Sequence, residues 1–240
     1  MKTSTNEHVS LTLVTDPFGV FDVATLQDCF DLVIRFKEHF VTDLHLSMNE
    51  IATKYHRKNA RRALRDVQVE RCEEPRQFLD DWVDLYRVLS ERHNIRGIRA
   101  FSRAAFAMQL SIPGVVMFRA MSQGIMVGAH IWFVQDEAAY SHLSAYSPTG
   151  YELRASYALY WRAIEYFREQ GLVAWLDGGA GISRDGTDNL SQFKQGWSTA
   201  TRPVWLCGCI LNRERYAYIV NAKGVSETTY FPAYRRGEFA

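Results

Sequence analysis

The sequence has almost no net charge, few cysteines and no long hydrophobic run. Its 28 Lys and Arg residues face 27 Asp and Glu residues, which gives a formal net charge of +1. A nearly neutral protein has no global field that attracts nucleic acid, so we expect no DNA partner. The longest apolar run is far shorter than the roughly 20 residues that a spanning helix needs, so we expect no membrane span.

Several signatures of other protein classes are also missing. Residues 1–10 are polar and lack the apolar segment of a secretory signal, so we expect a cytoplasmic protein. No Cys and His residues have the spacing of a zinc site, and no metal site is predicted. Neither a P-loop nor a Gly-x-Ser-x-Gly motif is present, which disfavours covalent serine catalysis. The cysteines show no disulfide framework and are expected to be reduced thiols: Cys29, Cys72, Cys207 and Cys209.

The hydrophobic pattern that is present switches between strand and helix periods. The order of elements favours an α/β or α+β fold, with a mixed, mostly antiparallel sheet and one parallel crossover. The last two strands are predicted to form a hairpin. Strands are predicted at residues 9–14, 67–70, 115–120, 125–134, 139–146, 172–176, 204–211 and 216–220. Helices are predicted at residues 25–40, 54–65, after Pro75, after Ser102, from Gly150 to Gly171 and at 189–195.

A single domain with an N-terminal extension accounts for this order. Hydrophobic residues make up 47% and charged residues 23% of the chain, the balance of an ordinary globular protein. A chain of 240 residues can bury a substantial core. We therefore expect residues 1–53 to form an extension, a strand plus a helix, packed on a main domain of residues 54–240.

Four patches in the second half of the chain occur in the order found in a known superfamily. They are YSHLSA at residues 140–145, GYELRASYALYW at 150–161, LDGG at 176–179 and FKQGW at 193–197. Together they resemble the FemAB-like branch of the GNAT acyltransferases. That branch includes peptidoglycan aminoacyltransferases and the CelD-like proteins of polysaccharide gene clusters. The likeness covers residues 54–218.

The resemblance implies the GNAT-like acyl-CoA N-acyltransferase fold, a central mixed sheet flanked by helices. It also implies transfer of an acyl or aminoacyl group to an amine on a sugar, peptide, or other cell-envelope or polysaccharide precursor. The co-substrate is then an acyl-CoA such as acetyl-CoA, or an aminoacyl-tRNA, and no cofactor is expected to be tightly bound. FemAB proteins carry two such domains and this chain has room for one, so a homodimer can rebuild the pair.

The strand-to-helix junction at Gly150 is the candidate site for the co-substrate. A helix start offers unpaired N–H groups that suit a phosphate, and Arg154 can add a bidentate contact. The structural alternative is that Thr149 caps the helix, with Glu152 as its capping-box partner. Ordinary GNAT enzymes cradle the CoA pyrophosphate in a Gly-rich loop, of which only Gly150 remains here. A non-catalytic binding module that has lost its donor site is therefore the alternative function. The candidate residues are Gly150, Tyr151, Glu152, Arg154, Ala155 and Ser156.

Three residues are candidate catalytic groups. His142, expected on one strand face with Ser144, can accept the proton of an attacking amine, and His130 has a similar but lesser claim. The alternative for both is a buried structural histidine. Asp177, at the end of a buried strand, can orient an amine or act as a base, or it is simply a turn former. Lys194 can neutralise a phosphate or an oxyanion, or it is a surface lysine beside two core aromatics.

A basic segment at residues 54–65 holds six Lys and Arg residues and no acidic residue. One interpretation is the solvated face of a helix. The other is a binding surface for a polyanion such as a nucleotide-sugar, a lipid phosphate or tRNA.

Overall fold

The computed structural model describes residues 8–183, 187–225 and 228–238. The chain forms two compact units. One comprises residues 39–201, and the other combines the segment before His39 with the segment from Arg202 onward. The long strands β2 (Leu32–Asp43) and β8 (Ala200–Ile210) each contribute residues to both units. The predicted boundary between residues 53 and 54 stays a prediction.

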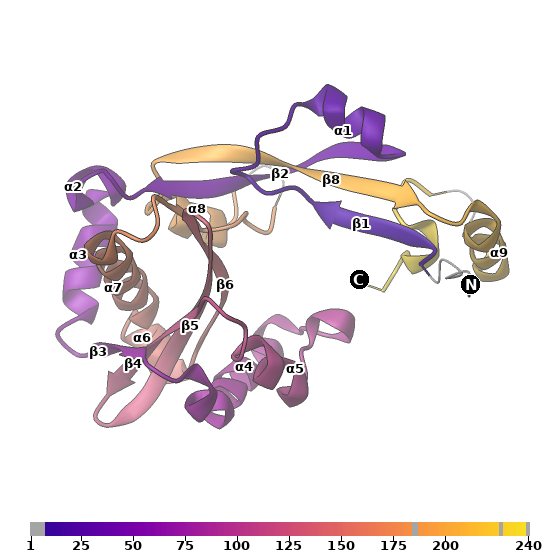
Figure 1. Ribbon diagram of the computed structural model, residues 1–240. Coiled ribbons are helices and arrows are strands. Elements are labelled where there is room, and N and C mark those ends of the chain that lie inside the picture. The colour runs from indigo at the N-terminus through magenta and orange to yellow at the C-terminus, as the bar shows by residue number, and fades with distance from the viewer. Residues whose placement is uncertain (1–7, 184–186, 226–227, 239–240) are drawn as a thin grey trace. The chain divides into compact units, whose positions relative to one another are not determined.

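Eight strands form one mixed sheet in the order β1-β8-β2-β7-β6-β5-β4-β3 (Figure 1). Strands β6 and β7 are parallel, and the pairs β1–β8, β2–β7, β3–β4, β4–β5 and β5–β6 are antiparallel. The predicted mixed, mostly antiparallel sheet with helices around it is therefore confirmed. Besides β2 and β8, the strands are β1 (Ser10–Val14), β3 (Gln68–Cys72), β4 (Val115–Ser122), β5 (Ile125–Gln135), β6 (Ala138–Tyr146) and β7 (Trp175–Asp177).

The described residues also contain α-helices and three short 3₁₀ turns. The helices are α1 (Val23–Cys29), α2 (Met48–Ile51), α3 (Lys54–Ala63), α4 (Leu79–His93), α5 (Arg103–Gln109), α6 (Pro148–Glu152), α7 (Ala155–Gln170), α8 (Asn189–Gln195) and α9 (Arg213–Lys223). The 3₁₀ turns are η1 (Pro75–Phe78), η2 (Gly97–Arg99) and η3 (Ala233–Arg235).

The unit of residues 39–201 has a hydrophobic core on each face of its sheet. Helices α3 and α7 cover one face, and helices α4 and α5 cover the other (Figure 1). Trp132 lies in the core beneath α7, and its neighbour Ile131 lies in the core beneath α4 and α5. Both side chains are fully buried, which agrees with a central strand covered on both sides.

A β-bulge interrupts the pairing of β5 with β6. Ile131 pairs with Leu143, but the next residue, Trp132, pairs with Ser141, so His142 is an extra residue. An extra residue shifts the alternation of side chains by one position along the bulged strand. Side chains alternate between the two faces of the sheet along β6, and this alternation is shifted by one residue after His142.

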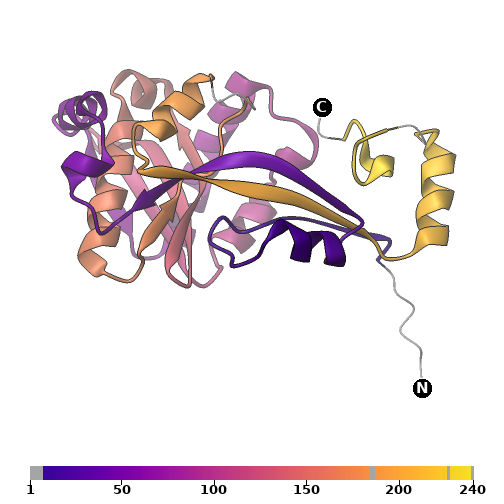
Figure 2. The ribbon, with the colours of Figure 1, turned by 90° about the horizontal axis from the view of Figure 1, so that it is seen from above.

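Residues 25–40 do not form one helix, contrary to the sequence prediction. Helix α1 is capped by Asp22, which accepts a hydrogen bond from Thr25 N–H, and it ends at Cys29. From Leu32 the chain is strand β2, visible as one of two long neighbouring strands in Figure 2. The spacing of the apolar residues fits a helix, but this segment is rich in β-branched and aromatic residues, and its pairing with β7 favours a strand.

The predicted hairpin at the end of the chain is also wrong, because residues 216–220 lie within helix α9. The Asn212 side chain caps this helix by accepting from Arg215 N–H, and Gly224 ends it with a left-handed φ of 62°. Asn before the first turn and Gly after the last are ordinary helix boundaries.

The predicted long helix is divided at Arg154 into α6 and α7. Arg154 has a left-handed φ of 58°, which few residues other than Gly adopt. A right-handed helix cannot continue through this conformation. Gly171 ends α7 in the left-handed conformation, as predicted. Ser147, rather than Thr149, caps α6, because its Oγ accepts a hydrogen bond of 3.1 Å from Gly150 N–H.

These two candidate caps give opposite expectations for stability. Replacing Ser147 by Ala should lower the free energy of unfolding by about 1 kcal/mol, because the Gly150 N–H loses its acceptor. Thr149 is exposed, and Thr149→Ala should leave that free energy nearly unchanged. Urea denaturation of both variants measures the difference, and a larger effect at Thr149 would contradict the observed cap.

Candidate functional site

Strands β6 and β7 separate soon after they pair. β7 is three residues long and contacts β6 only at Ala138–Tyr140, whereas β6 continues to Tyr146. After β7 the chain follows β2, because Gly178 N–H donates to the Phe40 carbonyl at 2.8 Å. In the part of the chain that the structure describes, no strand covers the β7 side of β6 beyond Tyr140. Polar groups at the end of a parallel strand are well placed to meet a ligand there.

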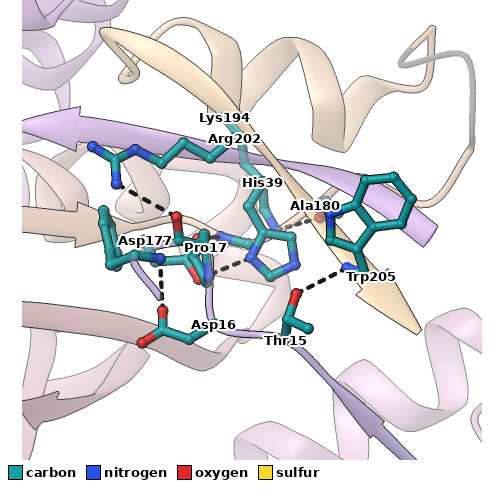
Figure 3. Close-up of polar contacts among 11 residues, drawn as sticks. Thr15, Asp16, Pro17, His39, Asp177, Ala180, Lys194, Arg202 and Trp205 are labelled. Atoms are coloured by element: carbon teal, nitrogen blue, oxygen red, sulfur yellow. Dashed lines mark hydrogen bonds and ion pairs between the residues drawn. The ribbon is translucent and has the colours of Figure 1, made fainter. Parts of the chain in front are cut away.

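Asp177, the last residue of β7, forms a pair with His39. Its Oδ2 lies 2.9 Å from His39 Nδ1, and its Oδ1 accepts a hydrogen bond of 2.7 Å from Gly179 N–H (Figure 3). The pairing of Val41 with Asp177 sets this contact, because His39 lies two residues before Val41 on β2. A carboxylate only accepts hydrogen bonds, so Nδ1 of His39 carries a proton and Nε2 of a neutral ring is free to accept one.

Lys194 lies over the loop that follows β7. Its Nζ donates a hydrogen bond of 2.6 Å to the Ala180 carbonyl (Figure 3). A Cβ added at Gly179 would lie 3.4 Å from Nζ, so the ammonium group is close to the backbone of the loop. Helix α8 carries Lys194, and Asp188 caps this helix by accepting hydrogen bonds from its first N–H groups.

A third group of polar side chains, from β5, β6 and α7, is buried behind this loop. His130 Nε2 lies 2.9 Å from Ser141 Oγ, and Ser141 also hydrogen-bonds Tyr160. The hydroxyl of Tyr160 lies 2.8 Å from where a Cβ on Gly178 would be. These side chains therefore reach the end of β7.

Burial sets the protonation of both titratable groups in this trio. It lowers the pKa of His130 to about 3, with smaller effects from the charges of Lys194 and His142. Burial also raises the pKa of Tyr160, and the negative charge of Asp177 adds to that rise. At neutral pH, His130 is therefore uncharged and Tyr160 keeps its phenolic proton.

These residues form one group, which we name the β7-end cluster. It lies entirely within the unit of residues 39–201. It joins an imidazole that is hydrogen-bonded through one ring nitrogen, a protonated phenol and an ammonium group, a set that can move a proton and stabilise negative charge. The cluster consists of His39, His130, Ser141, Tyr160, Asp177 and Lys194.

Two of the three predicted catalytic residues, Asp177 and Lys194, lie in the cluster, but His142 does not contact it. His142 Nε2 lies 3.1 Å from Gln109 Oε1, and its ring packs against Phe133 at 4.9 Å between centroids. Burial lowers the pKa of His142. The sequence predicts that Ser144 shares a strand face with His142. The bulge instead puts Ser144 opposite His130, so Ser144 and His142 lie on different faces of β6. The catalytic role of all three residues stays a prediction.

The predicted donor-binding segment is closely packed at its start. A Cβ on Gly150 would lie 1.9 Å from the Val127 carbonyl oxygen, so only glycine fits there. The ring of Tyr151 lies beneath the Arg92 guanidinium at 4.3 Å. Of the other predicted residues, Ala155 is buried, Arg154 and Ser156 are half-buried, and Glu152 is exposed. Their binding role stays a prediction.

A cavity of about 890 Å³ lies beside the β7-end cluster. Phe40 and Phe193 are on its wall, together with residues from the start of α3, from α7 and α8, and from residues 196–201. None of residues 150–156 lines it.

The patch FKQGW has a structural explanation at this cavity. His56 Nε2 donates to the Phe193 carbonyl at 3.0 Å, and the Trp197 ring stacks on Tyr160 at 5.6 Å. A Cβ on Gly196 would lie 1.9 Å from His56 Cε1, so glycine makes room for the histidine ring. Phe193, Gly196 and Trp197 thus pack α8 against α3 and α7 and hold Lys194 in place.

The basic helix α3 has a buried side and a charged side. His56, Asn59, Ala60 and Ala63 are buried, and five of the six cations of residues 54–65 are exposed. This arrangement agrees with a solvated helix face. Across the described ranges, no helix has the length and apolar character needed to cross a bilayer.

Sequence reasoning missed three residues of the cluster, Ser141, Tyr160 and His39, of which His39 matters most to the proposed chemistry. The segment around it was assigned to a helix, which removed the strand alternation that links His39 to Val41. The available signal was the mixture of β-branched and aromatic residues between Leu32 and Thr42, which is typical of a strand.

The buried neutral His130 predicts a pH dependence of stability. Its pKa is about 3 in the folded protein against an ordinary value of 6.5, so between these limits the unfolded chain binds a proton that the folded protein does not. The free energy of unfolding should therefore fall as the pH falls through this window, by up to about 1.4 kcal/mol per pH unit.

The variant His130→Phe isolates this contribution. Burial also lowers the pKa of His56 and His142, so the wild type has other groups acting in the same direction. Urea denaturation from pH 7 to pH 4 should give a shallower slope for the variant than for the wild type. Equal slopes would show that His130 is not held neutral.

Comparison with known proteins places this fold in a family. A model described as an acetyltransferase (GNAT) domain matches residues 52–194. No curated protein sequence matches the chain. The crystal structure of FemX is 14% identical with a TM-score of 0.61, over 78% of this chain and 64% of FemX. The C-terminal domain of a putative lysylphosphatidylglycerol synthetase from Agrobacterium fabrum is 16% identical with a TM-score of 0.62, over 83% of this chain and 67% of that domain.

A third similar structure, L-PGS from Bacillus licheniformis, is 17% identical with a TM-score of 0.58, over 86% of this chain and 70% of the other. At these identities the likeness shows a shared fold, and the chain spans less than two thirds of FemX. Because the GNAT model matches more than half of the chain, the protein belongs to the GNAT acetyltransferase-domain family, as its sequence patches predicted.

Proposed function

We propose that the protein transfers an acyl or aminoacyl group to an amine at the β7-end cluster. The observation that carries this proposal is the His39–Asp177 pair at the end of β7, where β6 and β7 separate. It supplies an imidazole that the carboxylate orients through Nδ1, at the point where β6 and β7 separate. GNAT family membership supports the same reaction class.

In the proposed reaction the amine nitrogen attacks the carbonyl carbon of a thioester or ester. A C–N bond forms, and the C–S or C–O bond to the leaving group breaks. His39 Nε2 takes the proton that the amine loses and returns it to the leaving group, so the protein ends the cycle unchanged. Asp177 acts as a positioning residue, because its carboxylate holds Nδ1–H and thereby keeps Nε2 available.

Negative charge on the carbonyl oxygen needs hydrogen-bond donors. The uncovered edge of β6 beyond Tyr140 offers backbone N–H groups, and Tyr160 offers a phenol that burial keeps protonated. The ammonium group of Lys194 adds positive charge beside the loop after β7. The bulge at His142 bends the β6 backbone at this point. Bulges are common next to functional sites.

The donor and acceptor belong to the same proposal. The donor is an acyl-CoA or an aminoacyl-tRNA, held at residues 150–156, and the acceptor amine belongs to a small molecule or cell-envelope precursor. The shared fold with FemX and with a lysylphosphatidylglycerol synthetase domain supports these classes. The proposal also includes a cytoplasmic location and the pairing of two chains in a homodimer.

A binding module without catalysis is the alternative, and one observation favours it. Gly150 is packed against Val127, and its N–H is occupied by Ser147, so the helix start has little space for a phosphate at that residue. The two functions differ in whether product forms.

Replacement of the carboxylate tests the proposed mechanism. Asp177→Asn should lower kcat by about 100-fold or more, because an amide can stabilise the wrong tautomer of His39. Mass spectrometry of the product formed from acetyl-CoA and an amine such as glucosamine measures the rate.

Asp43→Asn is the matched control, because Asp43 also pairs with a histidine, His45, at 2.8 Å, but outside the cluster. It should leave kcat unchanged. Equal losses in both variants, or a loss of Asp177→Asn activity accompanied by a lower melting temperature, would point to a structural role for Asp177.

Donor binding gives a test that needs no acceptor. A ligand that binds the folded protein raises its melting temperature, by an amount equivalent to about 2.7 kcal/mol at 100 times its Kd. Acetyl-CoA or an aminoacyl-tRNA should therefore raise the melting temperature, and Arg154→Ala should reduce the shift. No shift with either donor, together with no product, would overturn the transferase and leave the binding module.

A further inference from the structure

The cavity beside the β7-end cluster has an uncharged lining. Its walls combine aromatic rings with amide and hydroxyl side chains, and none of the described residues that line it is Asp, Glu, Lys or Arg. The aromatic residues include Tyr55 and Tyr157, and the amides are Asn189, Gln192 and Gln195. Ligand sites of this size have a few polar groups on a mainly apolar wall, so the kind of polar group identifies the ligand.

His56 lies on the cavity wall, and it is neutral. Its Nε2 donates to the Phe193 carbonyl at 3.0 Å, which leaves Nδ1 to accept a hydrogen bond of 2.8 Å from Thr53 Oγ1. Burial lowers the pKa of His56. Tyr157 is neutral as well, since burial raises its pKa to about 12. The side chains that the structure describes in the lining therefore carry no charge at pH 7.

An uncharged lining disfavours a phosphate, a carboxylate or an ammonium group at this place. A charged ligand loses its hydration on entering a cavity, and none of the lining side chains within the described ranges carries a charge that compensates that loss. Amides and hydroxyls instead donate and accept hydrogen bonds with neutral groups. Aromatic rings present flat apolar surfaces that suit the C–H faces of a sugar ring.

We propose that this cavity binds a neutral saccharide, a binding site in addition to the proposed reaction centre. Its volume of about 890 Å³ has room for more than one sugar ring. Tyr55, with 64% of its surface exposed, forms the rim, and Gln192 and Gln195 lie on the adjoining wall.

The cavity is connected to the β7-end cluster by two of its walls. Phe40 lines the cavity, and its backbone holds Gly178 and Gly179 in place through hydrogen bonds of 2.8 and 3.1 Å. Phe193 lines it as well and precedes Lys194, and its ring lies 5.5 Å from that of Tyr160. The cavity wall therefore adjoins the loop after β7, while Phe40 and His39, consecutive residues of β2, point to opposite faces of the sheet.

Saturation-transfer NMR on the full chain tests the proposal with cellobiose and N-acetylglucosamine. Both sugars should receive saturation from the protein. Tyr55→Ala should weaken the affinity by about tenfold, because it removes the aromatic ring at the rim. Tyr55→Phe keeps the ring and should bind as the wild type does.

Tyr218→Ala is the matched control, because Tyr218 is also 64% exposed but lies on α9, in the other unit. It should leave sugar binding unchanged. No saturation of either sugar, or equal binding by Tyr55→Ala and the wild type, would overturn the saccharide site. Product formation with an amine that carries no sugar would preserve the transferase, and sugar binding without product would preserve the saccharide site alone.

Discussion

The short parallel pairing of β6 with β7 is the constraint on which the site depends. Because it stops at Asp177, the chain after β7 stays bonded to β2 but leaves β6, which has an uncovered edge beyond Tyr140 within the described residues. The continued pairing with β2 brings His39 beside Asp177. The backbone geometry that opens the sheet therefore also builds the imidazole–carboxylate pair, and a longer β7 would close the space that the pair faces.

Aromatic packing keeps this opening rigid. Tyr160 is held between His130, Trp132 and Trp197, with ring centroids 5.3 to 5.6 Å apart. Rings packed in this way fix one another's orientation and exclude water. The aromatic residues that pack beneath α7 and α8 therefore also bury His130 and Tyr160, and this burial shifts their pKa values.

The sequence was sufficient for the strands from residue 115 to residue 146 and for helix α8, where period and turn residues agree. It also pointed to Asp177 and Lys194, which the structure brings to one loop. It could not supply His39, because apolar spacing alone does not separate a helix from a strand, and the choice depends on pairing with β7. The sequence also could not show that the alternation of side chains along β6 shifts at His142, because a bulge is defined by the pairing of two strands.

The contact between Gly196 and His56 joins two segments that are far apart in the chain. Any side chain at position 196 would overlap the imidazole, and a smaller residue at position 56 would leave a hole beneath α8. A change at either position would therefore require a compensating change at the other.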